Sequence, residues 1–134
     1  MIAPDSSVLI AGYAPEHPFY DEASHSLSSV RQMGRLIAHT MAETYSVLTG
    51  RYPHPSANVL EYLSQFLTRE PVGLAPSSYP IVLRALAEGE IVGGAVYDGL
   101  IAATATERGL HLLSLDRRAV RTYAAIGTDY EILI

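Results

Sequence analysis

Four acidic residues lie within or at the end of apolar runs, where an ionised carboxylate is costly. Asp5 ends MIAPD, Glu43 interrupts LIAHTMAETYSVL, Asp98 lies in the middle of IVGGAVYDGLIAATA, and Asp116 ends LHLLSLD. The chain has no Lys, since all 9 basic residues are Arg, and no Arg adjoins the first three acids. A divalent cation is therefore the natural partner for these carboxylates. An all-carboxylate cation site indicates phosphate chemistry.

Asp98 is the most informative of the four acids. At about 100° per residue, its helix face also carries three apolar residues: Ile101, Ala102 and Ala105. Thr104 and Glu107 are predicted to lie on the opposite side, so Asp98 points toward the protein. The small residues Gly94 and Gly99 leave room for a cavity. A structural alternative is a buried Asp that accepts backbone amides at the start of its helix, but a functional role is favoured.

Asp5 and Asp116 each stand between a predicted strand and a predicted helix, where Asp is a common N-cap. Taken singly, each is better explained as a cap than as a ligand. The hydroxyls of Ser6, Ser7 and Ser114 are close by in sequence and are available to cap or to support a carboxylate. Two acids at two strand ends, together with one on an inward helix face, favour a shared site.

Glu43 has the weakest pattern. Its helix carries the stripe Met41, Tyr45 and Leu48, and Glu43 is predicted to lie roughly opposite. It is either exposed to solvent or turned sideways into a cleft. His39, one turn earlier, is a candidate supporting residue, although no HExxH or other zinc-like His spacing occurs.

Oxygen-only ligands suit Mg²⁺ or Mn²⁺. Clustered carboxylates repel one another and raise some pKa values until a cation binds. Such a site activates water and neutralises charge that develops on phosphorus. No pair of His residues is evident for attack by a ribose 2′-hydroxyl. Metal-assisted hydrolysis that leaves a 5′-phosphate and a 3′-hydroxyl is therefore the predicted reaction.

The composition predicts one globular domain. The 134 residues are 49% hydrophobic and 17% charged, enough for a single core and inconsistent with disorder. Asp98 splits the longest apolar stretch below the roughly 18 residues of a membrane span. No signal peptide is evident, and the absence of Cys excludes disulfides and thiolate chemistry. A cytoplasmic protein is the simplest expectation.

The net charge of −5 is unusual for a protein that binds nucleic acid. A negative net charge is easier to reconcile with binding of nucleic acid if four of the 14 acids share one cation site. Four Arg residues gather near the C-terminus: Arg108, Arg117, Arg118 and Arg121. They predict either a basic rim that holds phosphates or an ordinary solvated helix face.

Short apolar runs alternate with helical stretches along the chain. Strands are predicted at 2–4, 35–38, 72–75, 111–114 and 131–133, and helices at 7–14, 19–33, 40–48, 56–68, 77–88, 95–108 and 117–125. This alternation predicts an α/β fold of three layers, α/β/α, in which helices flank a central, mostly parallel sheet. Ligands in such folds bind beyond the carboxyl ends of the strands, where Asp5 and Asp116 fall.

Four segments resemble, in order and spacing, the acidic motifs of PIN-domain ribonucleases: MIAPDSSVLIAGY, AETYSVLTG, YDGLIAATATERG and LLSLDRRAVRTYAAIG. They are most similar to VapC-type toxins of bacterial and archaeal toxin–antitoxin pairs. The resemblance covers nearly the whole chain and implies a single PIN domain over 1–134. It implies that Asp5, Glu43, Asp98 and Asp116 surround one or two Mg²⁺ or Mn²⁺ ions.

The resemblance also implies endonucleolytic cleavage of RNA, such as transfer RNA, by a homodimer. A VapB-like antitoxin would hold it inactive by covering the acidic cleft with its tail. Ser7 and Ser114 match small polar positions beside the first and last acids. Pro4 departs from the family by replacing an apolar strand residue. Three Arg residues are hypothesised to hold RNA phosphates: Arg117, Arg118 and Arg121.

Three other classes compete with this interpretation. A receiver domain needs a Lys near its last strand, and this chain has none. A phosphatase with an aspartyl nucleophile needs a second Asp at position 7, which is Ser. The serious alternative is a catalytically silent PIN-like module that binds RNA or a partner without cutting. Retention of all four acids argues against it.

Overall fold

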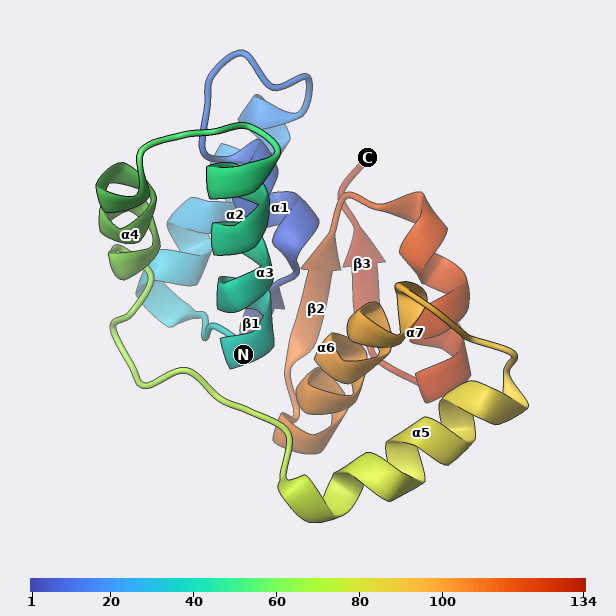
Figure 1. Ribbon diagram of the computed structural model, residues 1–134. Helices are drawn as coiled ribbons and strands as arrows, with labels where there is room; N and C mark the ends of the chain where they lie inside the picture. Colours follow the sequence, from blue (N-terminus) through green and yellow to red (C-terminus); the bar gives the residue numbers. More distant parts are fainter.

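The computed structural model describes all 134 residues as three layers, with a parallel sheet between two groups of helices (Figure 1). The sheet has the order β1-β2-β3 and consists of β1 (Ile2–Pro4), β2 (His111–Ser114) and β3 (Tyr130–Ile132). Pro4 pairs with Leu113, and Ser114 pairs with Ile132. All three strands therefore end at the same edge of the sheet. The predicted three-layer α/β/α fold is confirmed.

Helices α1–α4 cover one face of the sheet and α5–α7 cover the other (Figure 1). The α-helices are α1 (Ser6–Ala11), α2 (Tyr20–Met33), α3 (Ala38–Gly50), α4 (Ser56–Ser64), α5 (Tyr79–Glu88), α6 (Ala95–Arg108) and α7 (Val120–Ile126). Two short 3₁₀ helices, η1 (Pro76–Ser78) and η2 (Arg117–Ala119), precede α5 and α7. No helix combines the length and the apolar character needed to cross a membrane.

The predicted strands at 35–38 and 72–75 are wrong. Only two isolated bridges form there, Ile2 with Gly34 and Ile37 with Val72. The backbone contacts are regular but few: Val72 donates to Leu36 at 3.0 Å, and Ala38 donates to Val72 at 2.7 Å. The chain turns into α3 directly after Ile37, which leaves no room for a longer strand.

Several predicted helix ends also shift by a few residues. The predicted helix over 56–68 ends as α4 at Ser64, and the one over 7–14 ends as α1 at Ala11. The predicted helix over 117–125 begins with the 3₁₀ turn η2 before it becomes α7. Helix ends are the least regular part of an element, and 3₁₀ turns are common there.

Alternation along β2 divides the core into two halves. Leu112 points to the face where α6 and α7 pack, and Leu113 points to the face covered by α1–α4. Both side chains are buried. This two-sided burial is typical of a parallel strand inside an α/β sheet, and it anchors both helix layers close to the end of β2.

Helix α6 is buried on nearly every side in its middle. Residues Gly99 and Ile101–Ala105 are all buried, so the prediction that Thr104 lies on the side opposite the core is wrong. Thr104 can be buried because its hydroxyl donates to the carbonyl of Leu100 at 2.7 Å. Helix α5 packs closely on α6, with Leu86 against Gly99.

Gly99 permits that packing, and its replacement by Ala is expected to destabilise the protein. A Cβ at Gly99 would lie 2.6 Å from Cδ2 of Leu86 on α5. Helix propensity alone would favour Ala by up to about 1 kcal/mol, but overpacking costs about 1–3 kcal/mol. Urea unfolding of Gly99→Ala should therefore show a net loss. Gly73→Ala is the control, because no atom lies within 4 Å of its added Cβ. A stabilised Gly99→Ala protein would contradict this packing.

Candidate active site

Asp5 lies at the turn between β1 and α1 and is only 3% exposed. Its Oδ1 accepts the amide of Val8 at 3.3 Å and so caps α1, and it also accepts the hydroxyl of Ser7. Its Oδ2 accepts the hydroxyl of Tyr123 at 2.6 Å. Burial raises the pKa of Asp5, and the hydrogen bonds of its neighbours oppose the rise. Asp5 is thus a helix cap and also a buried carboxylate held from both sides.

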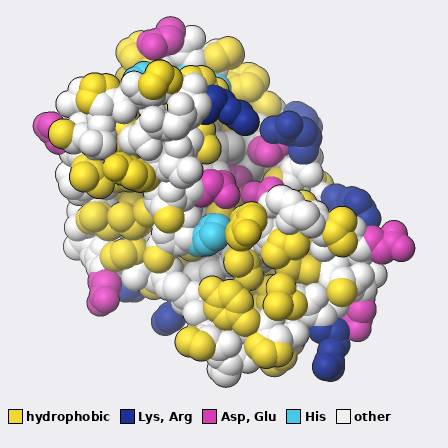
Figure 2. Space-filling model, viewed as in Figure 1, with side chains coloured by type: hydrophobic (Ala, Val, Ile, Leu, Met, Phe, Trp, Pro, Cys, Tyr) yellow, Lys and Arg dark blue, Asp and Glu magenta, His cyan; other side chains and the backbone are white.

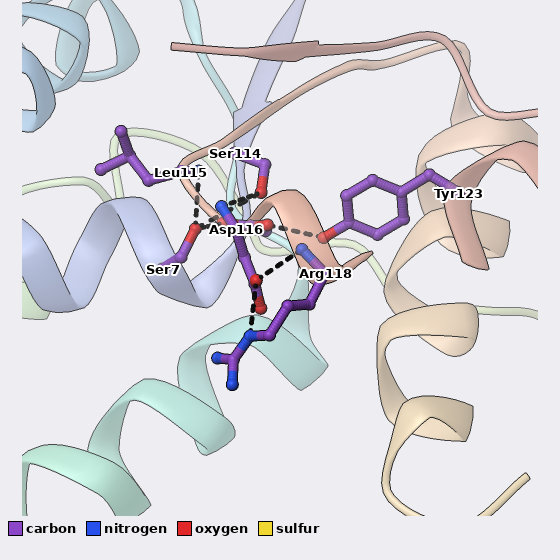
Figure 3. Close-up of polar contacts among 7 residues, drawn as sticks. Ser7, Ser114, Leu115, Asp116, Arg118 and Tyr123 are labelled. Carbon is purple, nitrogen blue, oxygen red and sulfur yellow. Dashed lines mark hydrogen bonds and ion pairs between the residues drawn. The ribbon is translucent and has the colours of Figure 1, made fainter. Parts of the chain in front are cut away.

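Asp116 follows β2 and caps η2, as the sequence predicted. Its Oδ1 accepts the backbone amide of Arg118 at 2.9 Å and the Nε of the same residue at 3.1 Å. The hydroxyl of Ser114 accepts the amide of Asp116 at 3.0 Å, and the hydroxyl of Ser7 accepts the amide of Leu115 at 2.8 Å (Figure 3). Ser7 and Ser114 therefore tie the ends of β1 and β2 together.

Asp98 lies in the first turn of α6 and is half-buried. Burial, together with the negative charges of Glu43, Asp5 and Asp116, raises its pKa to about 7, while Arg118 opposes the rise. Such effects require the four carboxylates to lie within a few ångströms to about ten ångströms of one another. The structure therefore brings together the four acids that the sequence singled out.

Glu43 is half-buried on α3 and accepts the hydroxyl of Ser6. The buried stripe of α3 consists of Thr40, Thr44 and Leu48. The predicted stripe is therefore wrong, because Tyr45 is exposed. Glu43 is adjacent to the true stripe and is half-buried, and its charge contributes to the raised pKa of Asp98, so it is not simply exposed to solvent.

His39 does not support Glu43, the role for which the sequence made it a candidate. Its ring stacks on that of Tyr97, with 5.5 Å between centroids and 9° between planes. It makes no hydrogen bond to Glu43. Figure 2 shows acidic side chains gathered in a hollow between the two helix layers, with basic side chains along part of its rim.

Tyr123 is a residue at the site that the sequence did not single out. Tyr123 is fully buried on α7, and Asp5 is the partner that satisfies its hydroxyl. A usable signal existed, because Tyr123 lies one turn after Ala119 on a helix face that is expected to be buried. A buried Tyr needs a polar partner for its hydroxyl.

The Arg residues near the C-terminus do not form one rim. Arg117 donates to the terminal carbonyl of Ile134, and Arg121 donates to the carbonyl of Gly89 at 3.0 Å. Arg118 alone of the predicted set lies beside an acid of the site. A different Arg, Arg51 after α3, lines the same pocket as Asp116 and Arg118.

The donor set fits a hard divalent cation in its chemistry, because every candidate ligand is an oxygen. As the side chains stand, no three metal-ligating groups converge closely enough to share one ion. Asp5, Glu43 and Asp116 are engaged by protein donors, whereas Asp98 accepts no hydrogen bond. A cation would supply the positive charge that the surroundings of Asp98 lack.

Comparison with known proteins agrees with this geometry. The PIN domain family model matches residues 2–125. Ribonuclease VapC40 of Mycobacterium tuberculosis is 40% identical over 137 aligned positions, which cover 99% of both chains. Ribonuclease VapC27 of the same organism is 41% identical over 95 positions, 69% of each chain. The chain therefore belongs to the PIN-domain family, among its VapC-type ribonucleases.

Proposed function

We propose that this protein is a metal-dependent endoribonuclease and the toxic component of a toxin–antitoxin pair. It hydrolyses RNA phosphodiester bonds and leaves 5′-phosphate and 3′-hydroxyl ends. The observation that carries the proposal is the gathering of Asp5, Glu43 and Asp116 around the half-buried Asp98, whose pKa is raised by burial and by these three carboxylates. Two acids on two helices and two acids after two strands share one electrostatic environment without an equal number of cations. Its relatives are named ribonucleases, which supports the same activity.

Asp5, Glu43, Asp98 and Asp116 would hold one or two Mg²⁺ or Mn²⁺ ions. When bound, such an ion polarises a phosphoryl oxygen and lowers the pKa of water. Tyr123 and Ser7 hold the Asp5 carboxylate in one orientation. Asp98 has no such restraint and can exchange its proton for a cation near neutral pH. Arg118, now paired with Asp116, is available to bind a phosphate when Asp116 takes a cation.

The metal requirement is tested by incubating a mixed transfer RNA and messenger RNA pool with the protein. Cleavage is expected with added Mg²⁺ or Mn²⁺ and is expected to stop with EDTA. New ends should be degraded by an exonuclease that requires a 5′-phosphate. RNA binding without cleavage in either metal would favour the alternative, a catalytically silent binding module. Cleavage that persists in EDTA would reject the metal-dependent mechanism.

The protein is further proposed to act as a homodimer on RNA such as transfer RNA, and to be inhibited by a VapB-like antitoxin. Exposed apolar residues on and after α5 support an oligomer, including Ile81, Leu83 and Val92. Figure 2 shows apolar side chains gathered over this part of the molecule. Light scattering at several concentrations measures the oligomeric state, and a concentration-independent monomer would exclude the dimer.

Arg118→Ala is expected to weaken RNA binding and to flatten its salt dependence. A single phosphate contact contributes about one to the slope of log affinity against log salt concentration. Arg69→Ala is the matched control, because Arg69 is exposed and lies outside the pocket that contains Asp116. Fluorescence anisotropy at salt concentrations from roughly 50 to 200 mM measures this slope of log affinity against log salt concentration. Equal slopes for the two variants would exclude a phosphate contact by Arg118.

A further inference from the structure

A second pocket lies beside the acidic site, between the loop after α1 and the turn after α3. These two segments lie side by side at the top of Figure 1. The pocket encloses about 260 Å³, and its walls include two Tyr and two His residues. Its aromatic and imidazole lining is Tyr13, His17, Tyr52 and His54. The proposed catalytic acids do not line it.

This aromatic pocket is adjacent to the pocket that contains Asp116. The two share Ile10, His17 and Tyr52 as walls. The acidic side of the junction carries Asp116, and two basic side chains, Arg51 and Arg118, line the same pocket. A bound molecule that carries both negative charges and flat rings could therefore extend from the acids, past the two guanidinium groups, into the aromatic pocket.

The rings of the aromatic pocket are supported from behind. Tyr13 packs on His54 with 4.7 Å between centroids, and its ring meets Tyr62 edge-on at 5.1 Å. The hydroxyl of Tyr62 donates to the carbonyl of Leu9 at 2.6 Å. Tyr52 is nearly parallel to His54, at 25° and 6.3 Å, and 45% of Tyr52 is exposed. The wall is thus preorganised, and Tyr52 leaves ring surface open.

His17 adds a polar group to the junction of the two pockets. Its Nδ1 accepts the backbone amide of Phe19 at 3.1 Å. A neutral imidazole that accepts at Nδ1 carries its proton on Nε2. No residue of the protein accepts from this Nε2, so the group is available to donate a hydrogen bond to a bound molecule.

We propose that the aromatic pocket binds one unpaired nucleobase of the RNA substrate, next to the phosphate that is cleaved; this rests on the proposed ribonuclease function. Tyr52 and His54 stack on the base, and the Nε2 of His17 donates to an acceptor on its edge. Arg51 holds the phosphate between this base and the acids. Flat π-surfaces next to guanidinium groups are the recurrent means of holding single-stranded RNA.

RNA fits the pocket better than a peptide does, for a reason of charge. A strand that runs from the acids to the rings passes Arg51 and Arg118, which pair with one phosphate per nucleotide. An apolar peptide segment would offer Arg51 no negatively charged partner. A pocket that reads one base would also give the enzyme its sequence preference at the cleavage site.

The test measures RNA binding by the cleavage-deficient Asp98→Asn protein in Mg²⁺. The probe is an RNA that the wild-type protein cuts, shortened to about ten single-stranded nucleotides, a length within known binding-site sizes. Tyr52→Ala in this background is expected to weaken binding roughly 5- to 100-fold, as loss of one stacked base does. Tyr52→Phe should bind as the parent does, because stacking needs only the ring. Tyr79→Ala is the matched control, with a similarly exposed Tyr on α5.

An abasic scan identifies the base. Removing a single base at each position in turn should weaken binding to the parent protein at one position, and Tyr52→Ala should be insensitive at that position. If the wild-type protein cuts RNA but Tyr52→Ala binds as tightly as Tyr52→Phe, the pocket does not hold a base. If Tyr52→Ala weakens only an antitoxin complex, the pocket belongs to a protein partner. If wild-type protein neither binds nor cuts RNA, the proposed function itself fails.

Discussion

Asp98→Asn should abolish RNA cleavage and leave the metal-free protein at least as stable as the wild type. The substitution removes a carboxylate that accepts no hydrogen bond and that three other acids surround. Loss of one ligand from a metal that stabilises a phosphoryl transition state costs several kcal/mol, or roughly 100- to 1000-fold or more in rate. Single-turnover cleavage measures the rate, and unfolding in EDTA measures the stability.

The pH dependence of stability gives this prediction a sharper form. The pKa of Asp98 is raised from 3.8 to about 7 in the folded protein. Between these values the folded state holds a proton that the unfolded state has lost. The free energy of unfolding of the metal-free protein should therefore fall as the pH rises from about 4 to 7. Each pKa unit corresponds to about 1.4 kcal/mol of unfolding free energy. Because Asp98 is partly exposed and solvent screens its charge, the expected fall over this pH range is about 1–3 kcal/mol.

Asp98→Asn should remove most of that slope and should raise the melting temperature at pH 8 in EDTA. Glu61→Gln is the control for loss of one negative charge, because Glu61 is exposed on α4. A structural carboxylate would behave in the opposite way, because loss of a satisfied acceptor costs about 1–3 kcal/mol. A lower melting temperature for Asp98→Asn, in the absence of metal, would therefore count against its role as a metal ligand.

Tyr123→Phe should destabilise the protein and impair cleavage through Asp5. The variant loses the 2.6 Å hydrogen bond to Asp5, a buried carboxylate. A hydrogen bond to a charged group contributes about 1.5–3 kcal/mol. The same bond lowers the pKa of Asp5, so its loss should favour the protonated acid and weaken metal binding at pH 6 more than at pH 8.

Isothermal calorimetry with Mn²⁺ at pH 6 and at pH 8 measures that difference, and urea unfolding measures the stability. Tyr130→Phe is the matched control: its ring lies 5.6 Å from that of Tyr123, but its hydroxyl makes no hydrogen bond within the protein. Equal metal affinity for Tyr123→Phe and Tyr130→Phe at both pH values would show that Tyr123 only fills space in the core.

Local patterns in the sequence were sufficient for the alternation of strands and helices and for the positions of the acids on them. Asp5 and Asp116 cap the helical turns predicted for them because capping depends on residues two or three positions away. Asp98 lies in the predicted helix on the face that carries Ile101 and Ala102. These features depend on contacts within one or two turns of chain, which periodicity encodes.

Only the tertiary structure decided which side chains face these acids. Ser6 reaches Glu43 across 37 residues, and Tyr123 reaches Asp5 across 118. The separation of Arg117 and Arg121 from Arg118, and the reduction of two predicted strands to single bridges, also depend on distant packing. Such contacts are set by how two helix layers seat on the sheet. The periodicity of a sequence predicts on which face of an element a residue lies, but it does not predict which distant residue packs against that face.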